Sequence, residues 1–320
     1  MSFTAFLDGE SLIWQWPGCR LELRSGRPLI AGILNITPDS FSDGGLYYPA
    51  ARPPEEEGAL AESAEIVAAG VNGGVELARQ GARIMDVGGQ STRPGYTPVA
   101  PEEELRRVMP VLEGLKALLP PEIAVSLDTD KPAVAEAVLS RGLAHILNDE
   151  SGGSRAMACI AARYKTPVIL MHRPAGDGRG ALEAVLEDLR QLRLQYIGAG
   201  CHPMGIALDP GLGFGKTAQE NLKILARTGD LHKLGAPIYI GASRKSFIGL
   251  VTGVQEARSR QGGSVGAALW AAEGGAHFLR VHDVGETAEA LNVYCLLKEL
   301  AAKTPEDRQL REITGQERPD

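Results

Sequence analysis

Residues 123–148 read IAVSLDTDKPAVAEAVLSRGLAHILN, and they contain the unit that decides the fold. The stretch begins with a short apolar run that ends at Asp128, and it finishes with a second such run that ends at Asn148. Between them, residues 131–142 have a helical pattern that stops at a glycine, a common C-terminal cap. Both runs are apolar on two faces, which is typical of buried parallel strands. The stretch therefore predicts a strand, a helix and a second parallel strand.

The same alternation continues along the chain on both sides of this unit. Eight apolar runs are separated by helix-like segments, of which 101–119 and 181–200 are the longest. We predict strands at residues 29–35, 83–88, 123–128, 144–148, 167–172, 205–209, 236–242 and 276–282. No linker interrupts the repeat, so the sequence predicts one α/β domain, a (β/α)8 TIM barrel with right-handed βα repeats.

Three segments lie outside the repeat. Residues 1–27 contain the runs LIWQW and CRLEL, which predict a short N-terminal strand or hairpin that caps the barrel floor. The barrel is then expected over 28–302, followed by a polar tail over 303–320. Residues 46–75 are long for one barrel loop, and they are either a mobile insertion or an extended first helix.

Composition limits the kinds of partner. The chain has 320 residues, of which 44% are hydrophobic, enough for one large core. Its formal net charge of −7 argues against a basic nucleic-acid-binding surface. The cysteines are far apart, which suggests neither a zinc site nor a disulfide framework. Without a basic n-region or a long apolar run, we expect a cytoplasmic protein with no membrane partner.

Polar residues stand at or just after the predicted strand ends. In a TIM barrel all strand carboxyl ends open onto one face, which holds the active site. The polar residues concerned are Asn35, Asp128, Asn148, Asp209, Lys245, Arg280 and His282, and the pair Met171 and His172 ends the predicted strand 167–172. The carboxylates and amides suit a heterocycle rich in N–H donors, and the cations suit a phosphate ester. A plainer alternative for Asp128 is that it, or the following Thr129, caps the next helix.

Three loops add candidate binding groups. Residues 35–45 (NITPDSFSDGG) mix amide, hydroxyl, carboxylate and aromatic groups, as expected of a lid over a polar ligand. Residues 88–95 (GGQSTRPG) offer the donor fork of Arg93. Residues 209–217 (DPGLGFGKT) do not have the spacing of a phosphate-binding P-loop, and Phe214 either stacks on a flat ring or packs within the loop.

Eight strings of the sequence together resemble the dihydropteroate synthase family, over roughly residues 12–300. They are GILNITPDSFSDGG, GGQSTRPG, SLDTDKP, ILND, LMH, LDPGLGFGKT, GASRKSFIG and RVHDV. The resemblance implies a transferase of folate biosynthesis. In its reaction, 4-aminobenzoate displaces diphosphate from 7,8-dihydropterin-6-ylmethyl diphosphate and gives 7,8-dihydropteroate.

The resemblance also implies roles for the pterin-binding residues. Asp128, Asn148 and Asp209 are expected to hold the edge of the pterin, and Lys245 to reach its ring. The residues implied to flank the faces of the ring are Met171, Phe214 and Arg280.

A second group of roles concerns the leaving group, the second substrate and assembly. Asn35 matches the position associated with Mg2+. The residues implied near the diphosphate are Arg93, Arg280 and His282. Those implied near 4-aminobenzoate, at a sulfonamide-sensitive surface, are Phe41, Thr92, Pro94 and Ser246. The groups expected to act in catalysis are Lys245, Asp43, Arg93 and His282, and a homodimer is expected.

The chain departs from the family pattern in three places. Gln90 stands where a Glu is usual, Leu212 replaces a common Phe, and the 46–75 segment is longer than usual. Three other functions remain open from sequence: the pterin-binding barrel of corrinoid methyltransferases, a paralogue that binds pterin phosphates without turnover, and a phosphosugar isomerase. The strings SRKS and RVHD and the STRPG loop favour a diphosphate-releasing enzyme over the first.

Overall fold

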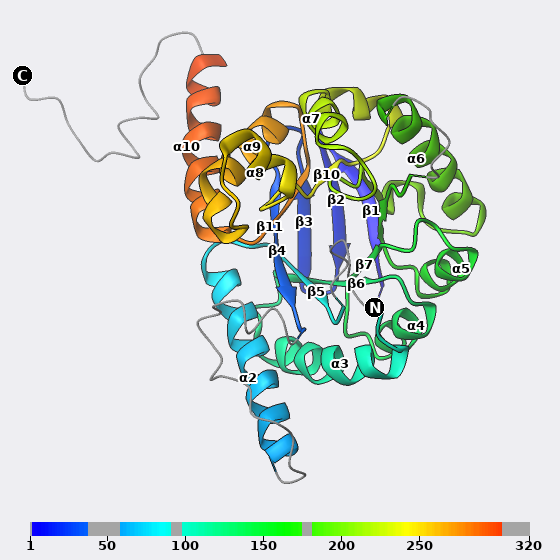
Figure 1. The fold of residues 1–320 in the computed structure, drawn as a ribbon. Coiled ribbons are helices and arrows are strands. Elements are labelled where there is room, and N and C mark those ends of the chain that lie inside the picture. The colour runs from blue at the N-terminus through cyan, green and yellow to red at the C-terminus, as the bar shows by residue number, and fades with distance from the viewer. Residues whose placement is uncertain (1, 38–57, 91–97, 175–180, 303–320) are drawn as a thin grey trace, which may run out of the picture.

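The main element of the structure, a computed structural model, is a parallel sheet of eight strands that curls into a barrel (Figure 1). Residues 2–37, 58–90, 98–174 and 181–302 are described. In hydrogen-bonding order the strands are β10 (Tyr239–Ile240), β11 (Phe278–Val281), β4 (Leu29–Asn35), β5 (Ile84–Gly88), β6 (Ala124–Thr129), β7 (Ile146–Asp149), β8 (Val168–Met171) and β9 (Ile206–Asp209). A parallel bridge between Leu208 and Ile238 brings β9 to the other edge of the sheet. The prediction of a (β/α)8 barrel is confirmed.

Helices surround the sheet and cover its outer face (Figure 1). They are α2 (Gly58–Arg79), α3 (Pro101–Leu118), α4 (Pro132–Ser140), α5 (Arg155–Tyr164), α6 (Ala181–Gly198), α7 (Ala218–Ala226), α8 (Ser246–Thr252), α9 (Gln261–Glu273) and α10 (Val284–Ala302), with short 3-10 turns at Pro203–Gly205, Thr228–Leu234 and Arg258–Arg260. Their apolar faces form one core cluster with the strands. In the described chain, no helix is long and apolar enough to cross a membrane.

Two elements differ in length from expectation. The seventh barrel strand, β10, keeps only two residues of the predicted 236–242. Pro237 has no N–H for a ladder bond, and the chain turns away again at Arg244, whose φ is +58°. The helix α2 accounts for 58–75 of the long segment, so the extended-helix alternative holds there, while 46–57 lie outside the described residues.

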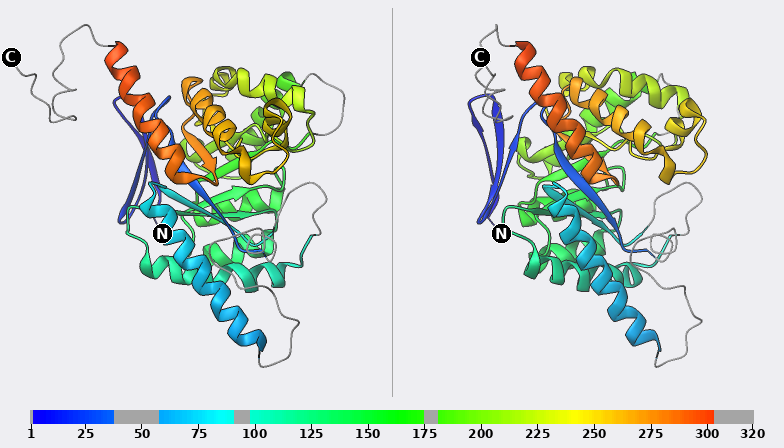
Figure 2. Two further views of the ribbon diagram at one scale, coloured as in Figure 1. Left: turned by 60° about the vertical axis from the view of Figure 1, so that its left-hand side comes forward. Right: turned by 90° about the vertical axis from the view of Figure 1, so that its left-hand side faces the viewer.

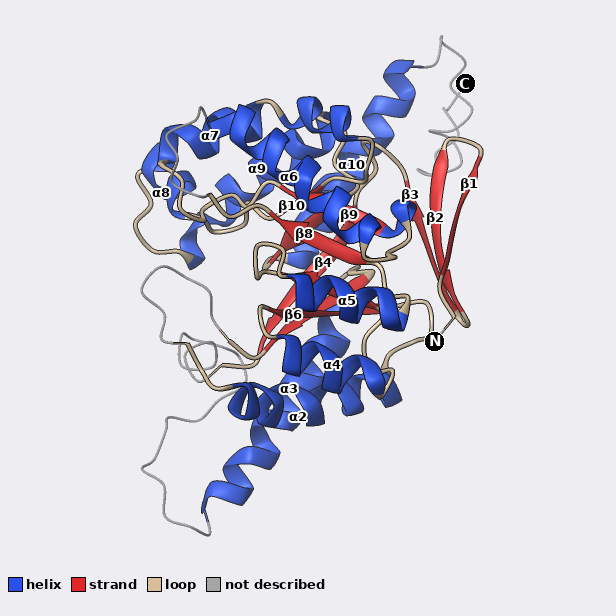
Figure 3. Cartoon of the chain, turned by 90° about the vertical axis from the view of Figure 1, so that its right-hand side faces the viewer, coloured by secondary structure: helices blue, strands red, loops and turns tan. Residues whose placement is uncertain are grey.

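A separate antiparallel sheet precedes the barrel. Its strands are β1 (Thr4–Asp8), β2 (Ser11–Trp16) and β3 (Cys19–Leu23), one more than the predicted hairpin. The sheet lies across one end of the barrel (Figures 2 and 3). There Trp14 and Trp16 share a buried cluster with residues at the starts of the barrel strands. Because this sheet covers the strand starts, the strand carboxyl ends form the other end, the barrel mouth.

Candidate active site

The row of residues at the mouth follows from strand register. Asn35 lies beside Gly88 on the neighbouring strand, Gly88 beside Asp128, and Asp128 beside Asn148. Parallel register keeps such partners on one side of the sheet. Four strands thus bring an amide, a glycine, a carboxylate and a second amide to one level of the mouth.

A buried ionic network joins the predicted pterin residues to a residue that the sequence analysis missed. Arg280 donates from Nε to Asp86 at 2.5 Å and from Nη2 to Asp128. Asn148 donates from Nδ2 to the same Asp86 carboxylate at 3.1 Å. The Asp128 carboxylate therefore accepts from the Arg280 guanidinium and does not cap α4, which has no side-chain cap. Since Asn148 turns its N–H2 group toward Asp86, its carbonyl oxygen is left to accept from a ligand.

Asp86 was identifiable from a local signal. It is a lone carboxylate in the apolar run RIMDVG, two residues before Gly88, so alternation places it on the same side of the strand. A fully buried carboxylate needs a partner, and Asp86 has no exposed surface. What the sequence did not provide was the partner, because Arg280 is 194 residues away.

Asp209, at the end of β9, is buried, and no cation of the described residues lies within hydrogen-bond distance of its carboxylate. Its Oδ1 accepts from the backbone N–H of Gly211 at 2.7 Å. Burial raises the pKa of Asp209 to about 6, although the Gly211 hydrogen bond and the charge of Lys245 oppose the rise. Gly211 has φ +65°, and a Cβ there would overlap the carbonyl oxygen of His172. Glycine at this turn therefore lets the chain fold back across β8.

Lys245 and Phe214 contact each other at the mouth. Together with Asp128, Asn148 and Asp209 they enclose the space that we call the cup. The Lys245 ammonium lies 4.2 Å from the centroid of the Phe214 ring, a cation–π contact. Burial and the charge of Arg280 lower the pKa of Lys245 to about 8. A Cβ at Gly213 would approach the Lys245 Cδ to 2.9 Å, so the glycine leaves room for the lysine stem. Lys216, which the sequence analysis did not assign to the site, fixes this loop by donating to the carbonyl of Gly211 at 2.8 Å.

The remaining described candidates lie around this cup. Met171 is buried and pairs in register with Asp209. His282 contacts the Ser243 hydroxyl through Nδ1 at 3.0 Å, beside the start of α8. Ser246 is exposed at the first position of α8 and has no hydrogen bond to the other described candidates. The residues that lie outside the described part of the chain are Phe41, Asp43, Thr92, Arg93 and Pro94.

Arg244 in the SRKS string supports the site rather than lining it. Its guanidinium pairs with Asp283 through two hydrogen bonds of 3.1 and 2.5 Å. Its backbone N–H donates to Ser264, and its carbonyl accepts from Arg260. These contacts hold an arginine in the left-handed region, which aims the next residue, Lys245, into the cup.

Gln90, just after β5, belongs to a cluster of polar and charged side chains around the Lys131 ammonium. Its Oε1 accepts from Lys131 Nζ at 2.8 Å and from the backbone N–H of Val99 at 3.0 Å. The carboxylate of Glu104, fully buried, binds the same ammonium at 2.7 Å, and Asp130 binds it at 2.9 Å. The negative charge that a Glu would bring at position 90 is therefore already supplied to Lys131 by two other residues.

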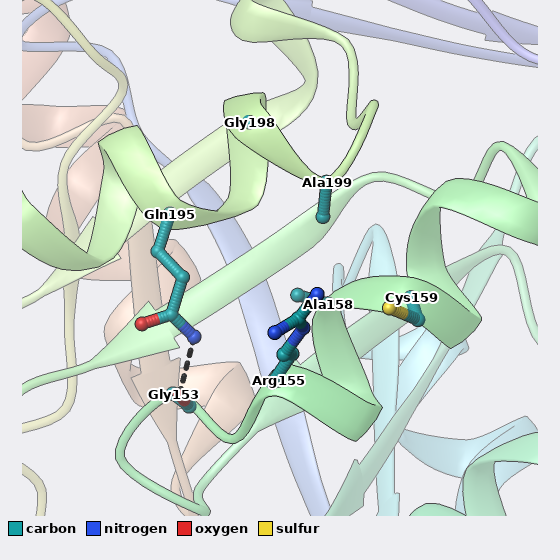
Figure 4. Close-up of a pocket in the computed structure, with 7 residues that line it drawn as sticks. All are labelled: Gly153, Arg155, Ala158, Cys159, Gln195, Gly198 and Ala199. Carbon is teal, nitrogen blue, oxygen red and sulfur yellow. Dashed lines mark hydrogen bonds between the residues drawn. The ribbon is translucent and has the colours of Figure 1, made fainter.

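A different hollow opens between α5 and α6, on the outside of the barrel (Figure 4). Gln195 donates across it to the carbonyl of Gly153 at 2.6 Å. Its lining is Gly153, Arg155, Ala158, Cys159, Gln195, Gly198 and Ala199. It includes none of the strand-end residues, so the candidate active site is the mouth and not this hollow.

Residues 31–282 match the family of pterin-binding enzymes. Fold and family match together thus define a barrel of the pterin-binding enzyme class. Curated dihydropteroate synthases are similar over most of this chain: that of Escherichia coli K12 is 40% identical over 287 residues, and that of Neisseria meningitidis serogroup C is 38% identical over 290 residues. The matches cover 86% and 87% of this chain and 93% and 96% of those proteins. The chain belongs to the dihydropteroate synthase family.

Solved structures agree with this assignment. A Xanthomonas albilineans dihydropteroate synthase with 4-aminobenzoic acid is 39% identical, with a TM-score of 0.77 over 88% of this chain and 96% of that one. A structure of the same organism's enzyme in complex with 7,8-dihydropteroate has a TM-score of 0.73, 36% identity and covers 86% of this chain and 98% of that one.

Proposed function

We propose that this chain condenses 7,8-dihydropterin-6-ylmethyl diphosphate with 4-aminobenzoate, releasing diphosphate and forming 7,8-dihydropteroate. Family membership and the joint location of Asp128, Asn148, Asp209 and Lys245 in one buried cup support this function. The single observation that carries it is that three strands bring three hydrogen-bond acceptors, suited to the N–H groups of a pterin ring, into that cup. A phosphosugar isomerase has no use for three such acceptors.

The pterin ring is bound through its donor edge. The Asp128 and Asp209 carboxylates and the Asn148 carbonyl accept from ring N–H groups, while Lys245 donates to a ring acceptor. Met171, Phe214 and Arg280 flank the ring faces, so that the methylene carbon points out of the cup. The Phe214 ring then exchanges part of its contact with Lys245 for contact with the pterin.

The chemical step is departure of diphosphate. The arylamine is already a neutral nucleophile, so no strong general base is required. Positive groups stabilise the charge that develops on the leaving oxygens. Because Arg280 already gives Nε and Nη2 to Asp86 and Asp128, Arg93 and His282 are left as the main protein cations and donors for the diphosphate. Asp43 supports the positive charge that develops at the methylene carbon.

Mg2+ is proposed as the metal, with Asn35 as its protein ligand. Mg2+ keeps several waters and takes few protein oxygens beside substrate phosphates. This preference fits the site, since Asn35 ends β4 in register with Gly88 at the mouth and offers one amide oxygen there. When bound, the metal would supply charge stabilisation to the leaving diphosphate.

The second substrate is assigned to the rim. Phe41, Thr92, Pro94 and Ser246 are proposed to hold 4-aminobenzoate, and sulfonamides are proposed to compete there. The exposure of Ser246 at the mouth supports this location. Sulfonamide inhibition that is relieved by added 4-aminobenzoate, but not by added pterin diphosphate, would support the assignment.

A homodimer in the cytoplasm is also proposed. Large apolar side chains are exposed on three adjacent helices, α8, α9 and α10 (Figure 1). They are Leu250, Val251, Trp270, Val293 and Leu297. An apolar surface shared by neighbouring helices suits a subunit contact. Light scattering of Trp270→Lys tests it: a wild-type monomer, or a variant that remains a dimer, contradicts this interface.

The function itself is tested by diphosphate release. The assay combines the purified protein with both substrates and Mg2+, and compares the rate with either substrate alone. Release only with both substrates, together with formation of dihydropteroate, is expected. Binding of the pterin diphosphate without release identifies a non-catalytic paralogue, and methyl transfer from a methylated folate identifies the corrinoid methyltransferase alternative.

A further inference from the structure

Glu150 lies inside the cup but belongs to none of the groups described so far. Its backbone N–H continues the ladder of β7 by bonding to the carbonyl of Thr129 at 3.3 Å. The register pairs Asp149 with Leu170 and Met171 with Asp209, which places Glu150 level with Asp209. Alternation along the strand puts its side chain on the same side as Asn148.

The carboxylate of Glu150 is buried and incompletely satisfied. The residue is only 2% exposed, and its Oε2 has no hydrogen-bond partner among the described residues. Among the described residues, the cation that pairs with it is the Nη2 of Arg173 at 3.8 Å, too far for a hydrogen bond. Such an oxygen is costly to bury, and in a native protein it commonly marks a functional position.

The charge of Glu150 reaches the residues that bind the pterin. Burial raises the pKa of Asp128 well above its usual value, and Glu150 is the second largest cause of that rise. Glu150 also opposes the lowering of the Lys245 pKa. Its carboxylate is therefore close to both the acceptor edge and the cationic wall of the cup.

We propose that Glu150 is a fourth acceptor for the pterin, binding a ring N–H that the other three acceptors leave unpaired. The proposal rests on the proposed function, since it adds a specificity residue to the same site. It also explains why a carboxylate is buried there with a spare oxygen: the ligand supplies the missing donor.

A competing role for Glu150 is to hold Arg173, which would then offer its positive charge to the diphosphate. The Arg173 side chain is 33% exposed, and its guanidinium carbon lies 5.7 Å from the centroid of the Phe214 ring. The Nε and Nη2 atoms of Arg173 are themselves buried without a hydrogen-bond partner among the described residues, but Glu150 lies level with Asp209 and on the same side of its strand as Asn148. The geometry therefore favours the pterin as the partner of Glu150.

The test compares two ligands that separate these roles. Wild type, Glu150→Gln and Glu150→Leu are titrated calorimetrically with a 7,8-dihydropterin lacking diphosphate, and separately with inorganic diphosphate in the presence of Mg2+. Glu150→Leu is expected to weaken pterin binding about 10- to 100-fold, as loss of a charged hydrogen bond does. Glu150→Gln should lose less, because its amide keeps one acceptor oxygen. Diphosphate affinity should not change.

The matched control is Glu136→Gln on α4. The Glu136 carboxylate is paired with Arg163 and Tyr164 on the barrel exterior, so this variant should bind the pterin like wild type. Thermal unfolding checks that each variant is folded. Wild-type pterin affinity in Glu150→Leu, or a loss confined to diphosphate binding, overturns the proposal. Failure of the wild type to bind the pterin would instead overturn the proposed function.

Discussion

At the residue scale, Asp209 combines deep burial with a single hydrogen bond to the described residues. Its carboxylate is almost fully buried, yet its only hydrogen bond in the described chain comes from the Gly211 backbone. Burial therefore raises its pKa to about 6. An acid with a raised pKa in the folded state destabilises the fold above that pH, and a ligand with N–H donors relieves the cost.

The first prediction concerns Asp209→Asn. The asparagine keeps an acceptor for Gly211 but removes the buried charge, so it should stabilise the ligand-free protein by about 1–3 kcal/mol at about pH 7.5. The gain should vanish below about pH 4, where Asp209 is protonated in both states. Urea unfolding at the two pH values measures the difference.

The same variant should also lose pterin binding. The amide oxygen of the asparagine stays with Gly211, so its N–H2 donor faces an N–H donor of the ring. Asp209→Ala is the matched comparison: it removes the Gly211 acceptor as well, and should lose both binding and stability. Near-normal pterin affinity in either variant contradicts the assigned role of Asp209.

The second prediction is the pH dependence of pterin affinity. Below the Asp209 pKa of about 6 the carboxylate gains a proton and stops accepting from the ring. Above the Lys245 pKa of about 8 the ammonium loses its charge. Affinity for a pterin lacking diphosphate should therefore be greatest between these values and fall on both sides.

Variants of Lys245 test whether this residue causes the fall of pterin affinity at alkaline pH. Lys245→Arg retains a charge at all accessible pH values, so the alkaline fall should disappear while the acid fall remains. Lys245→Ala should reduce turnover severely. An alkaline limb that persists unchanged in Lys245→Arg, or unchanged steady-state rates in Lys245→Ala, would argue against this role.

At the element scale, β5 connects two strands that are not its sheet neighbours, β11 and β7, through Asp86. The strand places this carboxylate between the guanidinium of Arg280 on β11 and the amide of Asn148 on β7. Asp86 acts on the ligand only through them, so it is a positioning residue. Its burial makes the network sensitive to the loss of any member.

The third prediction is that Asp86→Asn lowers stability by about 3–5 kcal/mol, because it breaks a buried ion pair from one side. Where the variant is folded, the KM for the pterin diphosphate should rise more than the KM for 4-aminobenzoate. Unfolding and steady-state kinetics measure the two effects.

A double variant tests whether Asp86 and Arg280 stabilise the protein as a pair. Asp86→Leu combined with Arg280→Met removes both partners, so it should be more stable than the sum of the two single changes predicts. Additive losses would show that Asp86 and Arg280 do not act as a pair.

At the scale of the whole molecule, the two ends of the barrel have different tasks. The antiparallel sheet β1–β3 closes the end where the strands start, and the mouth collects the polar residues. Trp14 is fully buried in the closed end, where its Nε1 donates to the carbonyl of Met204 at 2.8 Å. The closed end thus contributes to stability without taking part in the proposed chemistry, as is usual for TIM barrels.

The fourth prediction follows from this separation. Trp14→Ala should lower the free energy of unfolding by about 3–5 kcal/mol, the usual loss for a large buried aromatic residue. At temperatures where it stays folded, its kcat/KM should match wild type. Leu7→Ala on β1, where Leu7 is 70% exposed, is the control and should change stability by less than about 0.5 kcal/mol. A large loss of kcat/KM in folded Trp14→Ala would contradict the separation of the two ends.

The barrel and most of the candidate site were predictable because both depend on local patterns. Strands and helices alternate in the sequence, and Asp128, Asn148 and Asp209 stand where their strands end. The TIM-barrel rule then brings these ends together without coordinates. The length of β10 was predicted less well, since Pro237 and the pinned turn at Arg244 shorten it.

The sequence by itself thus determined that strand-end residues such as Asp128, Asn148 and Asp209 gather at the mouth and, through resemblance, which chemistry they are expected to share. Only the tertiary structure decided how they are paired: Arg280 is bound by Asp86, Asp209 keeps its carboxylate for a ligand, and Glu150 is buried with an oxygen to spare. The physical reason is that burial and partner choice depend on side chains brought from distant strands when the barrel closes. A polar residue in a strand signals that a partner exists, but the closed sheet decides whether that partner is another side chain or the substrate.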